Sequence, residues 1–118
     1  AKYLLEQNPD TKIVAVEPKG VSALHGDGPG IHQIQGIGDG FIPDVLDTGL
    51  ITDVVEVSDE DAINTARKLA KEQGLLVGTS SGANVFAAMQ IAEKYGKDEV
   101  IATVLADRAE RYFSTGLI

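Results

Sequence analysis

The stretch that decides the fold runs from Leu75 to Gly82 and reads LLVGTSSG. Its apolar start is typical of a buried β-strand, and a helical apolar pattern follows from Ala83. The two glycines allow a sharp turn, and the hydroxyls lie where the unpaired N–H groups of a helix N-terminus point outward. Two interpretations stay open. Either Ser80 or Ser81 caps the helix, or the hydroxyls bind a ligand at the end of a strand, and a cap does not exclude a ligand.

Strand-like and helix-like segments alternate on both sides of this stretch. The expected elements are a helix over 1–7, strands over 12–17 and 53–57, a helix from Ser58 to Gly74, a strand over 75–77, a helix over 82–95, a strand over 100–105, and a last helical turn that Asp107 caps and that extends through Tyr112. Alternation of this kind predicts an α/β fold with a parallel sheet and flanking helices.

The helix after Ser58 carries the clearest end signals. Ser58 is the expected N-cap with Asp61 at the capping-box position, and Gly74 ends the helix. An apolar stripe predicts that this helix lies flat on a sheet; the stripe contains Ala62, Ile63, Ala66, Leu69 and Ala70. The following helix is expected to bury Val85, Phe86, Met89 and Ala92.

The segment from Lys19 to Gly49 follows neither a strand period nor a helix period, and glycines interrupt it repeatedly. A connection of this length in a compact domain is typical of a functional loop, of disorder, or of an unrecognised short helix. His25 and His32 lie in it without carboxylates or thiolates at ligand spacing. We therefore expect two ordinary loop histidines and no metal site.

Composition restricts the classes of function. The chain has 118 residues, enough for one compact domain, and a net charge of -8, which argues against nucleic acids and anionic membranes as partners. Apolar runs are too short to span a membrane. The absence of cysteine fits a reducing cytoplasm. We expect small molecules or proteins as partners.

Parallel strands would bring polar residues together at their carboxyl ends, namely Glu17, the hydroxyls of 79–81, and Asp107. A serine hydroxyl can donate to a neutral ring nitrogen, whereas a carboxylate would hold that nitrogen protonated. No Ser, His and Asp set stands in a recognisable nucleophile frame, and no glycine-rich phosphate loop leads into a helix. These residues alone lack a nucleophile and a phosphate cradle.

Four motifs, in order along the chain, resemble the C-terminal part of the cysteine synthase (O-acetylserine sulfhydrylase) family. They are KIVAVEP at 12–18, PGIHQIQGIGDGFIP at 29–43, EQGLLVGTSSGA at 72–83 and ERYFST at 110–115. The resemblance implies a fold-type II, tryptophan synthase β-like enzyme that uses pyridoxal 5'-phosphate for β-replacement, in which acetate leaves O-acetylserine and sulfide adds to form cysteine.

By this resemblance, Ser80 binds the pyridine nitrogen of the cofactor. The implied cofactor-binding residues are Ser80, Gly36 and Asp107, and the implied substrate loop contains Gln35, Gly36, Ile37, Gly38 and Phe41. The family's pattern PDSGERY is replaced here by ADRAERY at 106–112, which puts in doubt the turn beside the nitrogen. Gln33 stands where lysine is frequent, which would weaken docking of the serine acetyltransferase tail that some members bind.

The family's Schiff-base lysine motif has no match among the lysines of this chain. We therefore expect residues 1–118 to be a C-terminal segment, without the N-terminal half that carries this lysine, and to contain no catalytic residue of their own. The family implies a homodimer for the complete enzyme. Two alternatives stay open: a cystathionine β-synthase that uses homocysteine, and a non-catalytic binding or regulatory remnant of the fold.

Overall fold

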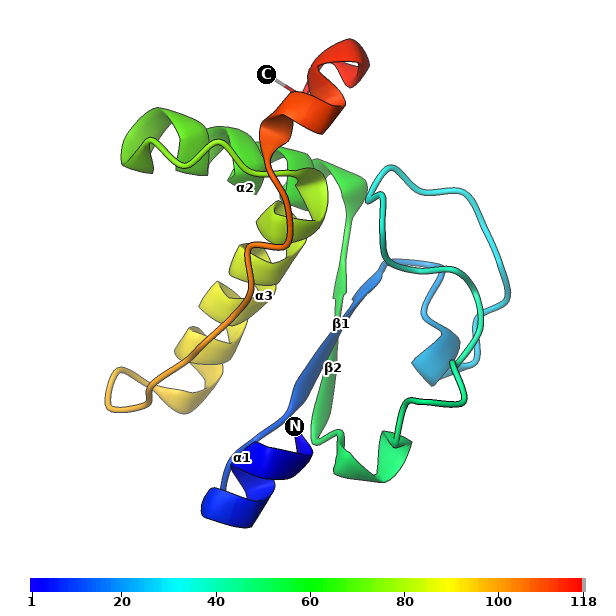
Figure 1. Ribbon diagram of the computed structural model, residues 1–118, viewed down its shortest axis with the longest axis vertical. Helices are drawn as coiled ribbons and strands as arrows, with labels where there is room; N and C mark the ends of the chain where they lie inside the picture. The colour runs from blue at the N-terminus through cyan, green and yellow to red at the C-terminus, as the bar shows by residue number, and fades with distance from the viewer. Residues whose placement is uncertain (118) are drawn as a thin grey trace.

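The computed structural model describes residues 1–117 and shows an α/β fold (Figure 1). Its elements are α1 (Lys2–Gln7), β1 (Val14–Pro18), the 3-10 helices η1 (Ala23–His25) and η2 (Thr48–Leu50), β2 (Asp53–Val57), α2 (Asp59–Gln73), α3 (Thr79–Tyr95) and the 3-10 helix η3 (Ala109–Thr115). In Figure 1, α2 and α3 lie on one side of the strands and the long β1–β2 connection lies on the other.

The sheet consists of β1 and β2, which pair in parallel with Glu17 opposite Glu56. Both strands were predicted from their apolar runs and both form; β2 occupies the predicted residues, whereas β1 spans Val14–Pro18 instead of 12–17. The connection between them contains η1 and η2, so the long loop does include short helical turns. Parallel pairing places the carboxyl ends of both strands at one edge, where the loop begins.

Two other predicted strands do not form within residues 1–117. Residues 75–77 contribute only an isolated antiparallel bridge between Val77 and Arg108, and residues 100–105 form no regular secondary structure. An apolar run becomes a strand only where a neighbour accepts its backbone hydrogen bonds, and the described part of the chain supplies none here. Instead, the Asn84 side-chain amide donates to the Val104 carbonyl at 2.8 Å.

The predicted end signals of α2 are confirmed. The Asp61 N–H donates to Ser58 Oγ at 3.1 Å, and the Ser58 hydroxyl donates to Asp61 Oδ2 at 2.6 Å. Gly74 ends the helix in the left-handed conformation with φ 68°. The prediction that α2 lies flat on a sheet is wrong. Helix α2 makes its main contacts with α3, and α3 is the helix that contacts both strands.

The crossing of α2 and α3 depends on Gly82. A Cβ atom at this position would collide with the Ala62 carbonyl oxygen and would lie 2.9 Å from the Ala66 nitrogen. Small residues on both helices therefore allow their backbones to approach closely. This contact fixes the first turn of α3 against α2.

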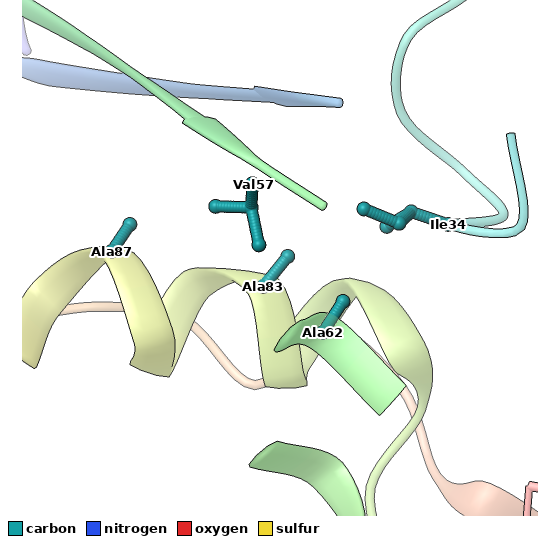
Figure 2. Close-up of a cluster of buried hydrophobic side chains, with 5 residues drawn as sticks. All are labelled: Ile34, Val57, Ala62, Ala83 and Ala87. Carbon is teal, nitrogen blue, oxygen red and sulfur yellow. The ribbon is translucent and has the colours of Figure 1, made fainter. Parts of the chain in front are cut away.

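The hydrophobic core lies where the sheet, α2, α3 and the β1–β2 loop meet. Figure 2 shows five buried side chains that face one another: Ile34, Val57, Ala62, Ala83 and Ala87. The buried face predicted for α3 is corrected: the buried positions are Ala83, Ala87 and Ile91, whereas Val85, Phe86 and Ala92 are partly buried and Met89 is 51% exposed. Close packing favours the small side chains on the inner face, although the larger ones are more hydrophobic.

No helix within residues 1–117 has the length and apolar character that a membrane crossing requires.

Candidate functional site

The start of α3 carries three buried hydroxyls. The N-cap residue is Gly78, without a side-chain cap, so the prediction that Ser80 or Ser81 caps the helix is wrong. Helix α3 begins at Thr79, and the hydroxyls lie within its first turn, with Ser80 6% exposed. Within residues 1–117, Thr79 Oγ1 and Ser81 Oγ are buried and have no hydrogen-bond partner. Buried polar groups normally have partners, so this turn has unused capacity to bind a ligand.

Asp107 lies directly beside this turn. The Gly78 N–H donates to the Asp107 carbonyl at 3.2 Å, and the Ala109 N–H donates to the Leu76 carbonyl at 3.2 Å. A Cβ atom at Gly78 would collide with Asp107 Oδ1 and would lie 2.6 Å from the Tyr112 ring. The backbone can approach this closely only because residue 78 is glycine, and the approach brings Asp107 against the residue that precedes Thr79.

The role predicted for Asp107 as a helix cap is corrected. Arg108 is the N-cap residue of η3, and its side chain makes no capping bond. Asp107 instead accepts a hydrogen bond from the Tyr112 hydroxyl through Oδ2, while its buried Oδ1 has no partner in the described residues. The geometry of the turn, with a cap one residue later, directs the carboxylate toward Tyr112.

The pair of Tyr112 and Asp107 predicts a pH dependence of stability. The hydrogen bond to Asp107, followed by burial, raises the pKa of Tyr112 above its ordinary value. The protonated tyrosine is therefore favoured in the folded state, and its stabilising contribution is complete below about pH 10. As the pH rises through the higher pKa of the folded state, that contribution is lost. Urea titrations at a series of pH values, from neutral to strongly alkaline, should show this loss as a fall in the free energy of unfolding. Tyr112→Phe should remove the part of this pH dependence that the Tyr112 hydroxyl causes.

The loop predicted to bind substrate is anchored to the same end of α3. Ile34 belongs to the core cluster of Figure 2 together with Ala83, and Ile37 packs against that cluster. Gln35 and Gly36 are exposed between them, whereas Phe41 lies outside the cluster and is 62% exposed. The structure thus ties 34–37 to the start of α3 through the core, but it does not bring Phe41 there.

Glu17 does not contribute to this site, contrary to the expectation from the strand ends. Its carboxylate accepts hydrogen bonds from the Ser22 hydroxyl and, at 3.2 Å, from the Leu24 N–H. Glu56, its neighbour on β2, lies 3.2 Å from His25 Nδ1 and accepts from the Gly20 N–H at 3.4 Å. Both carboxylates hold the loop that follows β1.

Beside the Asp107 carboxylate, the chemistry available in the first turn of α3 is that of uncharged hydroxyls at a helix N-terminus. Such groups can donate to a neutral acceptor without transferring a formal charge. The part of the chain that the structure describes contains no group of three or more His, Cys, Asp or Glu residues able to hold a metal ion. The sequence motif pointed to the hydroxyls of 79–81, but the role of Tyr112 was not predicted, because it depends on how 106–112 fold against this turn.

Comparisons with known proteins point to one family. The family described as "Pyridoxal-phosphate dependent enzyme" matches residues 1–107. The chain is 43% identical over 116 residues to a cysteine synthase of Staphylococcus aureus, covering 98% of this chain and 37% of the relative. The chain therefore spans little more than a third of the length of this curated relative.

Comparisons with solved structures point to the same family. A cysteine synthase from Entamoeba histolytica superimposes with a TM-score of 0.94 and 38% identity, covering 98% of this chain and 35% of that chain. An O-acetylserine dependent cystathionine beta-synthase from Helicobacter pylori gives a TM-score of 0.89 and 43% identity, covering 99% of this chain and 38% of that chain. On these grounds, the chain belongs to the family of pyridoxal-phosphate dependent enzymes.

Proposed function

We propose that the complete protein containing this chain is a cysteine synthase, which converts O-acetylserine and sulfide into L-cysteine and acetate with pyridoxal 5'-phosphate. The observation that carries this proposal is the buried first turn of α3, which presents hydroxyls, including that of Ser80, instead of a carboxylate. The similarity to cysteine synthases from two organisms supports the same activity.

The residues of this turn fit the cofactor's ring nitrogen. Buried Ser80 provides a neutral donor. The hydroxyls of Thr79 and Ser81 have no hydrogen-bond partner in the described residues, so they are available to a ligand. When bound, the cofactor supplies an electron sink for negative charge that develops on the amino-acid substrate. A Ser80 hydroxyl would donate to an unprotonated ring nitrogen and so restrain that sink, which suits elimination and addition at the β-carbon.

Asp107 and the loop complete the proposed site. Asp107, held by Tyr112, orients the turn of 106–109 beside Gly78, so that this turn packs against the cofactor-binding end of α3. Gln35 and Gly36 are exposed and free to bind the substrate, and by the family resemblance Gly36 would also lie next to the cofactor. Ile37 and Gly38 hold this segment in place, and Phe41 lies beyond it as an exposed side chain of the same loop.

The remaining features of the complete protein are proposed from the family. Residues 1–118 form the C-terminal segment of the catalytic domain, and a lysine outside this segment forms the bond to the cofactor. The complete protein is proposed to be a cytoplasmic homodimer. The tail of a serine acetyltransferase is proposed as a protein partner, with weaker docking because of Gln33.

A second candidate activity is that of a cystathionine β-synthase. Its support is the similarity to the Helicobacter pylori enzyme, at 43% identity. The same contact from Ser80 would serve both reactions, and homocysteine would replace sulfide as the second substrate. The third hypothesis is that the protein is a non-catalytic remnant of the fold.

Analysis of the products that the complete protein forms distinguishes these three hypotheses. The protein, loaded with pyridoxal 5'-phosphate, is incubated with O-acetylserine and either sulfide or homocysteine, and amino acids are separated by chromatography. We expect cysteine from sulfide at a higher rate than cystathionine from homocysteine. The reverse order would favour the second activity. No product, together with no covalent cofactor adduct after borohydride reduction, would identify a non-catalytic protein.

A further inference from the structure

The imidazole ring of His32 joins the two ends of the loop segment that contains Gln35 and Gly36. The Ile34 N–H donates to His32 Nδ1 at 3.1 Å. On the other side of the ring, Nε2 lies 3.1 Å from the carbonyl oxygen of Gly38. One side chain therefore contacts the backbone on both sides of the exposed part of the segment.

These partners define the form of the ring. A backbone N–H can only donate, so His32 Nδ1 must be without a proton; a carbonyl can only accept, so Nε2 must carry one. The neutral imidazole with its proton on Nε2 satisfies both bonds. The other neutral tautomer and the doubly protonated ring would each lose at least the bond from Ile34.

The surroundings of the ring leave the backbone little room to move. Gly38 has φ 71°, and a Cβ atom there would lie 2.8 Å from His32 Nε2 and 2.8 Å from Pro18 Cδ. Pro18, at the end of β1, is buried, and Ile34 is fully buried in the core. Both ends of the segment are thus fixed to the core and the sheet, while Gln35 and Gly36 stay exposed.

We propose that His32 is a positioning residue, which holds Gln35 and Gly36 in the geometry that binds the amino-acid substrate. The inference rests on the proposed function, because it assigns these two exposed residues to the substrate. His32 itself touches neither substrate nor cofactor. Its contribution is that the segment is already ordered before the substrate arrives, so the cost of ordering is not subtracted from binding.

The test compares variants of the complete, cofactor-loaded protein. His32→Ala removes both bonds. His32→Asn keeps an acceptor for the Ile34 N–H, since an asparagine oxygen commonly accepts from the backbone two residues on, but it is too short to reach Gly38. The matched control is His25→Ala, which removes a histidine from the same loop whose Nδ1 faces Glu56 at 3.2 Å.

We expect His32→Ala to raise the KM for O-acetylserine about tenfold, as for the loss of one net hydrogen bond, with a smaller change in kcat. His32→Asn should restore part of this loss, and His25→Ala should leave KM unchanged. In hydrogen–deuterium exchange measured by mass spectrometry, the peptide containing 32–38 should exchange faster in His32→Ala than in the unmodified protein.

An unchanged KM for His32→Ala in an otherwise active enzyme would overturn the proposal. An equal KM effect in His25→Ala would also overturn it, because the effect would then be general weakening of the loop. An inactive unmodified protein would instead contradict the proposed cysteine synthase activity. In that case the exchange of 32–38 would still decide whether His32 orders the segment.

Discussion

Gly82→Ala is expected to lower the free energy of unfolding by about 3 kcal/mol, at the upper end of the usual range for overpacking. The added methyl group would collide with the Ala62 carbonyl oxygen and crowd the Ala66 nitrogen. These are backbone atoms of α2, which cannot turn aside as a flexible side chain can. The helices must therefore separate, which also displaces the first turn of α3 and its hydroxyls.

Urea unfolding of the protein and its variants measures this effect. Gly28→Ala is the matched control, because a Cβ atom there meets nothing within 4 Å. The control should change stability by a few tenths of a kcal/mol in either direction, as is usual for surface positions. Equal stability of Gly82→Ala and Gly28→Ala would show that α2 and α3 are not packed as closely as described.

Ser80→Asp in the complete enzyme is expected to slow the first half-reaction, in which acetate leaves O-acetylserine, about a hundredfold, comparable to the loss of one preorganised polar contact in an active site. Ser80 is 6% exposed, so a carboxylate there would be largely removed from water and would hold the ring nitrogen of the cofactor protonated. The cofactor's electron sink would then differ from the one that the hydroxyl provides.

Rapid-mixing absorption measurements of the cofactor with O-acetylserine give the rate of this step. Ser80→Thr is the control that keeps a hydroxyl, and it should retain a substantial part of the activity. If Ser80→Asp carries out the first half-reaction at the rate of the unmodified enzyme, Ser80 has no part in tuning the cofactor.

The elements that local signals determine were predictable from the sequence. The ends of α2 follow from Ser58, Asp61 and Gly74, whose bonds and backbone conformation lie within a few residues of one another. Strand β2 occupies the same residues that its apolar run indicates. Such signals need no knowledge of distant parts of the chain.

Errors arose where the structure depends on distant contacts. Residues 75–77 and 100–105 have the composition of buried strands, but composition does not show whether a partner strand is present. The prediction for the inner face of α3 was wrong because it favoured the large side chain of Met89, whereas the buried positions hold Ala83, Ala87 and Ile91. Packing distance, which decides this face, is not visible in a hydrophobic pattern.

The candidate site was predictable in its location and not in its details. The motif of 75–82 and its glycines identified the turn that carries the hydroxyls. The contact of Asp107 with Gly78 and the bond from Tyr112 depend on how 106–112 folds back onto that turn. Likewise, His32 was interpreted as an ordinary loop histidine, because its two bonds to the backbone leave no mark on the sequence.

A crystal structure of the complete protein with pyridoxal 5'-phosphate bound would test the proposed cofactor site most directly. We predict that the hydroxyl oxygen of Ser80 lies within hydrogen-bond distance, about 2.8 Å, of the cofactor's ring nitrogen. We also predict that the turn containing Asp107 keeps its contact with Gly78. A ring nitrogen paired with the Asp107 carboxylate, or a cofactor bound away from the first turn of α3, would contradict the account.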